Sequence, residues 1–264
     1  MTDSVLYARR GTSAWITLNR PQVHNAFDDT LIAALTGAFE RASADALVRS
    51  VVLTGNGSCF SAGADLNWMR GMAGASEADN RDDSLRLARL MRTLQYLAKP
   101  TIARVNGAAY GGGVGLIACC DIAIAVDTAK FALSEVKLGL VPAVISPYVI
   151  AAIGLREARR LFITGEVFDA ATAARIGLLH AAVSGNELDE AIERQLYLLA
   201  KAGPIAQSEA KQLALRVAGN DAAQAQRLDA DNAELIARLR ISEEGQHGLA
   251  AFLDKRAPRW VAPS

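Results

Sequence analysis

Residues Val105–Leu116 read VNGAAYGGGVGL and decide the fold, because a β-rich segment, 101–105, leads into a glycine cluster and then into an apolar segment of helical character. Glycine has no Cβ, so the backbone at such a strand-to-helix passage can approach a ligand closely. The first amides of a helix lack acceptors and lie at the positive end of its dipole. The stretch therefore predicts a site that stabilises negative charge developing on an oxygen.

A second loop, Ser61–Leu66 (SAGADL), has the same small-residue character and also follows a predicted strand. Taken alone, it is typical of an ordinary strand-to-helix turn in which Asp65 caps a short helix. Taken with Gly111–Gly113, it suggests more, because one backbone donor from each loop would form a two-amide oxyanion hole.

Glu135 is a candidate acid or base because it lies in the otherwise apolar segment Phe131–Pro142. A carboxyl group among apolar neighbours should have a raised pKa and could exchange protons near neutral pH. The alternative is an exposed glutamate paired with Lys137, and the residues alone leave both interpretations open.

Composition excludes several classes of protein. The 264 residues are 51% hydrophobic and 21% charged, which suits one large globular domain or a core with an appendage. A net charge of zero argues against bulk nucleic-acid binding, and no apolar run is long enough to span a membrane. The three cysteines and three histidines share no metal-ligand spacing, so no metal is expected. We expect a cytoplasmic enzyme.

The order of patterns predicts an α/β fold. Strands alternate with helices up to about Val126, which implies right-handed crossovers, and the chain becomes predominantly helical from Leu155. Asp28 should cap a helix that follows it. A polar segment, 71–83, is predicted to be a mobile loop before a helix at 84–98. The expected strands are 5–9, 14–18, 50–54, 101–105 and 121–126.

Many ordered blocks of the sequence together resemble the enoyl-CoA hydratase/isomerase (crotonase) superfamily. The likeness covers nearly the whole chain and includes Asn19–Pro21, Asn25–Phe27, Phe60–Leu66, Asn106–Gly113, Cys120–Ala125, Phe131–Pro142, Leu161–Gly165, Ala174–Leu178 and Phe252–Arg256. The resemblance implies a ClpP-like ββα spiral core over residues 1–200, with a C-terminal helical region, 201–264, that builds homotrimers, often paired into homohexamers.

The resemblance also implies an acyl-CoA thioester as substrate and no separate cofactor, since CoA is part of the substrate. The amides of Ala64 and Gly112 would hold the thioester oxygen as it becomes an enolate, with Glu135 moving the proton. The residues implied to contact CoA or the acyl chain are His24, Ala62, Asp65, Leu66, Trp68, Tyr148, Phe252 and Lys255.

Two departures from the family pattern bear on the reaction. Position 115, where hydratases usually carry their first catalytic glutamate, is a glycine in this sequence. The site then has one carboxylate, which makes the 1,3-proton shift of a Δ3,Δ2-enoyl-CoA isomerase the chemically simpler reaction. In contrast, Ser134–Val149 resembles bacterial methylglutaconyl-CoA and isohexenylglutaconyl-CoA hydratases, as in leucine breakdown. This second likeness favours hydration of a branched, carboxylated enoyl-CoA. Lys137, Arg70, Ser146 and Tyr148 are sequence candidates for binding the carboxylate. A non-catalytic CoA- or RNA-binding module remains the third interpretation.

Overall fold

The computed structural model describes residues 3–262, and its strands form two sheets. The six-stranded sheet has the order β1-β2-β3-β5-β7-β10, and the four-stranded sheet has the order β4-β6-β8-β9. The larger sheet contains β1 (Val5–Arg10), β2 (Ser13–Leu18), β3 (Ser50–Gly55), β5 (Thr101–Val105), β7 (Ile122–Val126) and β10 (Ala181–Val183). The smaller sheet contains β4 (Cys59–Ser61), β6 (Ala108–Tyr110), β8 (Lys130–Ala132) and β9 (Val167–Asp169).

Successive strand pairs build a spiral. The pairs β3/β4, β5/β6 and β7/β8 each give one strand to the larger sheet and the next to the smaller sheet. Within each sheet these strands pair in parallel, with Val52 opposite Ile102 and Ala109 opposite Phe131. The predicted α/β architecture of stacked ββα turns is therefore confirmed, and it places the loops after β4 and β6 next to each other.

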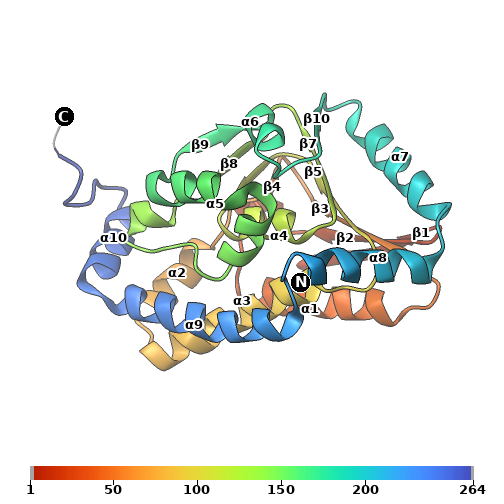
Figure 1. The fold of residues 1–264 in the computed structure, drawn as a ribbon. Helices are drawn as coiled ribbons and strands as arrows, with labels where there is room; N and C mark the ends of the chain where they lie inside the picture. The colour runs from red at the N-terminus through yellow and green to blue at the C-terminus, as the bar shows by residue number, and fades with distance from the viewer. Residues whose placement is uncertain (1–2, 263–264) are drawn as a thin grey trace.

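Helices surround the sheets, as Figure 1 shows. Asp28 caps α1 as predicted, since its side chain accepts a hydrogen bond from the N–H of Leu31. The helices are η1 (Pro21–Val23), α1 (Asp29–Ala44), α2 (Leu66–Ala73), α3 (Glu77–Gln95), α4 (Gly112–Cys119), η2 (Glu135–Leu138), α5 (Ser146–Thr164), α6 (Ala170–Arg175), α7 (Leu188–Ala200), α8 (Pro204–Val217), α9 (Ala222–Ile241) and α10 (Glu243–Leu253).

The apolar side chains form two clusters. The main core draws on both sheets and the helices around them, with Phe39, Leu53 and Phe131 among its buried members. A smaller cluster joins α2, α9 and α10 to the segment after η2, and it contains Met69, Leu140, Ala143, Ile236 and Leu249. The two clusters face each other across the cavity described below.

The predicted mobile loop at 71–83 is wrong. Helix α2 continues to Ala73, and α3 begins at Glu77, behind a capping box made by Ser76 and Asp79. Asn80 and Asp83 are completely buried. Helices are recognised in a sequence by an apolar face, and the inward-facing polar residues of α3 interrupt that face. The sequence of its first turns therefore suggested a loop.

The C-terminal helices fold back onto the rest of the chain. Helix α9 lies along α3, and α10 lies beside α2 (Figure 1). Helix α10 also contacts η2. Among the described residues, no helix combines the length and the apolar character needed to cross a membrane.

Candidate active site

The two glycine-containing loops meet, as the sequence predicted. Strand β4 pairs with β6 in parallel, with Cys59 opposite Ala108. A Cβ placed on Gly63 would lie 3.0 Å from the carbonyl oxygen of Tyr110, and one on Gly113 would lie 2.9 Å from the Cβ of Ser61. The backbones approach this closely only because both positions are glycine.

The backbone leaves one N–H on each loop without an acceptor. The N–H of Phe27 donates to the carbonyl of Gly63 at 2.6 Å, and the N–H of Asp65 donates to the carbonyl of Phe27 at 2.8 Å. This parallel bridge directs the N–H of Ala64 away from Phe27. Gly112 is the first residue of α4, so its N–H has no acceptor within the helix. Among the described residues neither amide has a hydrogen-bond acceptor, which is the arrangement that an oxyanion hole needs.

Phe27 ties the two loops together. Its backbone bridges Ala64, and its ring lies so close to Gly112 that a Cβ there would overlap it. Both residues line the same cavity as Phe27. The two residues whose amides the sequence predicted to act together therefore lie on one wall of a cavity.

Glu135 points at this wall. It begins η2, and its Oε1 lies 3.1 Å from where a Cβ of Gly111 would stand. Its Oε2 is buried and has no hydrogen-bond partner among the described residues, and no ion pair in that part of the chain joins it to Lys137. Burial raises the pKa of Glu135 to about 7. The predicted carboxyl group in apolar surroundings is confirmed.

The cavity is largely apolar. Among the described residues, its lining holds one carboxylate, Glu135, and one cationic side chain, Arg240. The apolar part of the lining includes Met69, Met72, Leu87, Leu138, Leu140, Val141, Val144, Ile145, Ile236 and Leu249.

The structure explains how Gly115 excludes a second carboxylate. A Cβ at this position would overlap the side chain of Ile145 and would lie 3.3 Å from the Cε of Met91. Ile145 and Met91 are themselves buried. Apolar side chains thus occupy the space into which a glutamate at position 115 would extend.

Several of the other predicted residues belong to this site. Ala62, Trp68 and Phe252 line the cavity, together with Ala64, Gly112 and Glu135. The indole N–H of Trp68 donates to Asp29 Oδ1 at 3.2 Å, which fixes the orientation of the ring. Phe252 comes from α10 of the same chain.

Asp65 and Leu66 do not line the cavity. Asp65 Oδ1 accepts hydrogen bonds from the N–H groups of Asn67 and Trp68, and Oδ2 pairs with Arg20 at 3.2 Å. The helix-capping interpretation of Asp65 is confirmed. Leu66 is an exposed residue at the start of α2.

His24, Lys255 and Tyr148 also lie outside the cavity lining. His24 and Lys255 are exposed, and both adopt positive φ angles, of 52° and 54°. Tyr148 is buried in the main core on α5, where its hydroxyl has no hydrogen-bond partner among residues 3–262. The structure therefore does not place these three side chains beside Glu135.

Arg240 is the charged residue of the described cavity lining that sequence reasoning missed. It follows Ile236 by one helical turn on α9, and both side chains line the cavity. The signal available in the sequence was an arginine on the apolar face that also carries Ala233, Ile236 and Ala237.

Comparison with known proteins agrees with this geometry. The family described as "Enoyl-CoA hydratase/isomerase" matches residues 9–263. A 2,3-dehydroadipyl-CoA hydratase of Escherichia coli is 34% identical over 97% of this chain and 98% of its own length.

Solved structures agree in fold. A Legionella pneumophila protein whose description includes the name crotonase is 46% identical, with a TM-score of 0.80 over 99% of this chain and 100% of that one. A Mycobacterium avium enoyl-CoA hydratase is 34% identical, with a TM-score of 0.87 over 99% and 100% of the two chains. The chain therefore belongs to the enoyl-CoA hydratase/isomerase family, the crotonase superfamily, and is an enzyme of the enoyl-CoA hydratase class.

Proposed function

We propose that this enzyme hydrates a branched α,β-unsaturated acyl-CoA whose acyl chain carries a carboxylate, as 3-methylglutaconyl-CoA does. The observation that carries the proposal is the position of Glu135. Its Oε2 has no hydrogen-bond partner among the described residues, and its carboxyl group has a pKa of about 7 and lies beside the loop that supplies the Gly112 amide. A base with such a pKa is half ionised near neutral pH and can both accept and return a proton.

The reaction can run with this single carboxylate. Glu135 takes a proton from water as the water oxygen attacks C3 of the bound ester. The electron pair of the C2=C3 bond moves towards the thioester, and its oxygen becomes an enolate oxygen that the amides of Ala64 and Gly112 stabilise. Glu135 then delivers the proton to C2, and the thioester carbonyl forms again. Both the hydroxyl and the new hydrogen come from one water on one face of the double bond.

The acyl group is inferred from two observations. Ser134–Val149 resembles bacterial methylglutaconyl-CoA hydratases, and this segment supplies cavity-lining residues from Ser134 to Ile145. The E. coli relative is named for an acyl group that also ends in a carboxylate. An apolar cavity with one cationic side chain suits such a substrate.

Isomerisation is the second candidate, and the space filled by Ile145 at Gly115 favours it. With Glu135 as the only carboxylate of the described cavity lining, the same amides could hold an enolate while Glu135 moves a proton from C2 to C4 of a 3-enoyl-CoA.

Turnover of 3-methylglutaconyl-CoA, crotonyl-CoA and a 3-enoyl-CoA, with products identified by mass, separates the candidates. We expect the branched acid to gain the mass of one water. Conversion of the 3-enoyl ester alone, without a change in mass, would overturn hydration and make Glu135 an isomerase base.

A further inference from the structure

Arg240 is an unusual side chain for a wall of this cavity. Glu135 is the only other charged residue of the described lining, and the side chain of Arg240 is only 13% exposed. A buried guanidinium loses most of its hydration. This desolvation costs free energy unless its N–H groups have hydrogen-bond partners. The partners that the protein supplies therefore decide what Arg240 can do.

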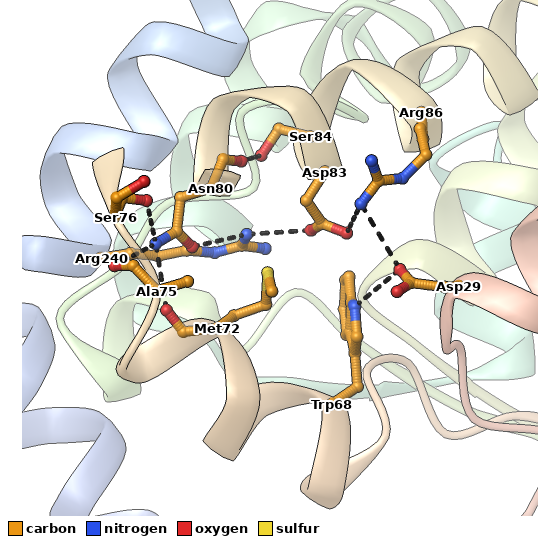
Figure 2. Close-up of polar contacts among 10 residues, drawn as sticks. All are labelled: Asp29, Trp68, Met72, Ala75, Ser76, Asn80, Asp83, Ser84, Arg86 and Arg240. Carbon is orange, nitrogen blue, oxygen red and sulfur yellow. Dashed lines mark hydrogen bonds and ion pairs between the residues drawn. The ribbon is translucent and has the colours of Figure 1, made fainter. Parts of the chain in front are cut away.

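The protein occupies only one nitrogen of the guanidinium. Nη1 donates to Asn80 Oδ1 at 3.2 Å and to Asp83 Oδ2 at 3.1 Å (Figure 2). Nε and Nη2 have no hydrogen-bond partner among the described residues, and neither atom is sealed from solvent. These two nitrogens form one edge of the guanidinium, the donor pair that matches the two oxygens of a carboxylate.

The side chains around Arg240 hold it in place. Asn80 donates from its amide nitrogen to the backbone carbonyls of Met72 and Ser76, which fixes its Oδ1 towards Arg240. The ring centre of Trp68 lies 5.5 Å from the guanidinium carbon. Figure 2 shows Arg240 lying between these groups from α2 and α3. A preorganised cation binds a ligand with little further loss of conformational entropy.

The local charge also favours an anion. Asp83 is completely buried and contacts two cations, Arg240 through Oδ2 and Arg86 through Oδ1 at 3.3 Å. Asp29, which pairs with Arg86 at 3.7 Å, is 60% exposed and therefore screened by solvent. Because Asp83 is shared with Arg86, it neutralises Arg240 only in part, and Arg240 is the cation of the described cavity lining.

Arg240 is not needed merely to join α3 to α9. A second ion pair between the same helices, Arg92 with Asp229, lies outside the cavity lining. Apolar side chains in place of both Arg240 and Asp83 would serve packing as well as the buried ion pair does, whereas replacing Arg240 alone leaves the buried Asp83 with Arg86 as its cationic partner among the described residues. The arginine is best explained by a ligand in the cavity.

We propose that Arg240 binds the carboxylate of the substrate acyl chain through Nε and Nη2, with Asn80 and Asp83 as positioning residues. The proposal rests on the hydratase function proposed above. It makes Arg240 the residue that selects carboxylated acyl groups over neutral ones, while Glu135 and the two amides carry out the reaction.

The test compares 3-methylglutaconyl-CoA with its neutral monoamide, which has the same shape, in the wild type and in Arg240→Met and Arg240→Lys. We expect Arg240→Met to lose about 10- to 100-fold in kcat/KM for the acid, mainly through KM, and less than about threefold for the amide. Arg240→Lys should recover part of the preference, because lysine restores the charge without the paired donors.

Arg92→Met is the matched control, since it breaks the other α3–α9 ion pair. It should keep the wild-type ratio of acid to amide even if it lowers stability. Equal losses on both substrates in Arg240→Met would overturn the proposal and make Arg240 a packing residue. Turnover of crotonyl-CoA would still support the hydratase in that case, whereas no turnover of any ester would overturn the hydratase itself.

A binding measurement covers the case in which Arg240→Met does not fold. Calorimetry of the wild type with 3-methylglutaryl-CoA and its monoamide should give tighter binding for the acid, and the difference should shrink with added salt. Equal affinities would overturn the proposal.

Discussion

The carboxyl group of Glu135 lies among apolar side chains, and its buried Oε2 has no partner within residues 3–262 that would make it a stabilising contact of the fold. Replacement by glutamine keeps the shape and removes the ability to exchange a proton. We expect Glu135→Gln to lose about 10²- to 10⁴-fold in kcat and to bind a saturated acyl-CoA as the wild type does. Steady-state kinetics and calorimetry measure the two quantities. Near-normal turnover in this variant would remove Glu135 from the mechanism.

The same group should make stability depend on pH. Because the pKa of Glu135 is raised from 4.5 to about 7, the folded state binds more protons than the unfolded state between these values. Wild-type stability is therefore lost as pH rises through this window, by at most about 3 kcal/mol. Glu135→Gln lacks this loss, so it should gain stability relative to the wild type between pH 5 and pH 8 in urea denaturation. A constant difference across that range would contradict the raised pKa of Glu135.

At the residue scale, the sequence predicts those site residues that depend on local backbone structure. It does not predict a residue whose position depends on contacts distant in the sequence. Ala64 and Gly112 could be found because glycine-containing loops after strands expose amides, and Glu135 because its neighbours in sequence are apolar. Arg240 could not, because its partner Asp83 lies 157 positions away. The four sequence candidates for binding the substrate carboxylate do not line the cavity, and their role in binding stays a prediction.

At the scale of elements, α10 holds the turn that carries Glu135. A Cβ on Gly248 would lie 2.3 Å from the carbonyl oxygen of Leu138, the last residue of η2, and a Cβ on Gly139 would lie 2.7 Å from that of Glu244. Gly248→Ala should therefore push α10 away from η2, lower stability by about 1–3 kcal/mol and reduce kcat as Glu135 shifts. Thermal unfolding and kinetics measure both effects.

Gly37→Ala is the control for that experiment. Gly37 lies in α1 with no atom within 4 Å of its would-be Cβ, so alanine should stabilise the helix by about 0.5–1 kcal/mol and leave kcat unchanged. If Gly248→Ala behaves like Gly37→Ala, the contact of α10 with η2 does not position Glu135.

Elements were predictable where the local sequence carries a clear strand or capping signal. Strands β1 and β2 and the start of α1 follow the pattern and the capping rule closely, because their environment is set by neighbouring residues. The start of α3 was not predictable. Asn80 and Asp83 face the interior because Arg240 and the carbonyls of α2 satisfy them, and these partners are invisible in the local sequence.

At the scale of the whole molecule, α8 carries apolar side chains that the rest of the chain leaves exposed. None of its residues is buried, and Ile205, Leu213 and Val217 are 79%, 51% and 78% exposed. Apolar side chains gathered on one helix of a folded chain mark a contact surface. The resemblance to the crotonase superfamily predicts homotrimers or homohexamers built by this C-terminal region, and we propose that a second copy of the chain covers α8.

Leu213→Asp tests this assembly. Burying three such side chains contributes about 2 kcal/mol each to association, and a charge among them costs more than the lost leucine contributes. We therefore expect the wild type to sediment as a multiple of 27.9 kDa and Leu213→Asp to sediment as a single chain with unchanged far-ultraviolet circular dichroism. Leu213→Met, which keeps the face apolar, should assemble as the wild type does.

A wild type that sediments at 27.9 kDa at micromolar concentration would leave α8 exposed in solution and contradict the predicted oligomer. Because Glu135, the two amides and Arg240 all belong to one chain, a single-chain variant should also retain measurable turnover.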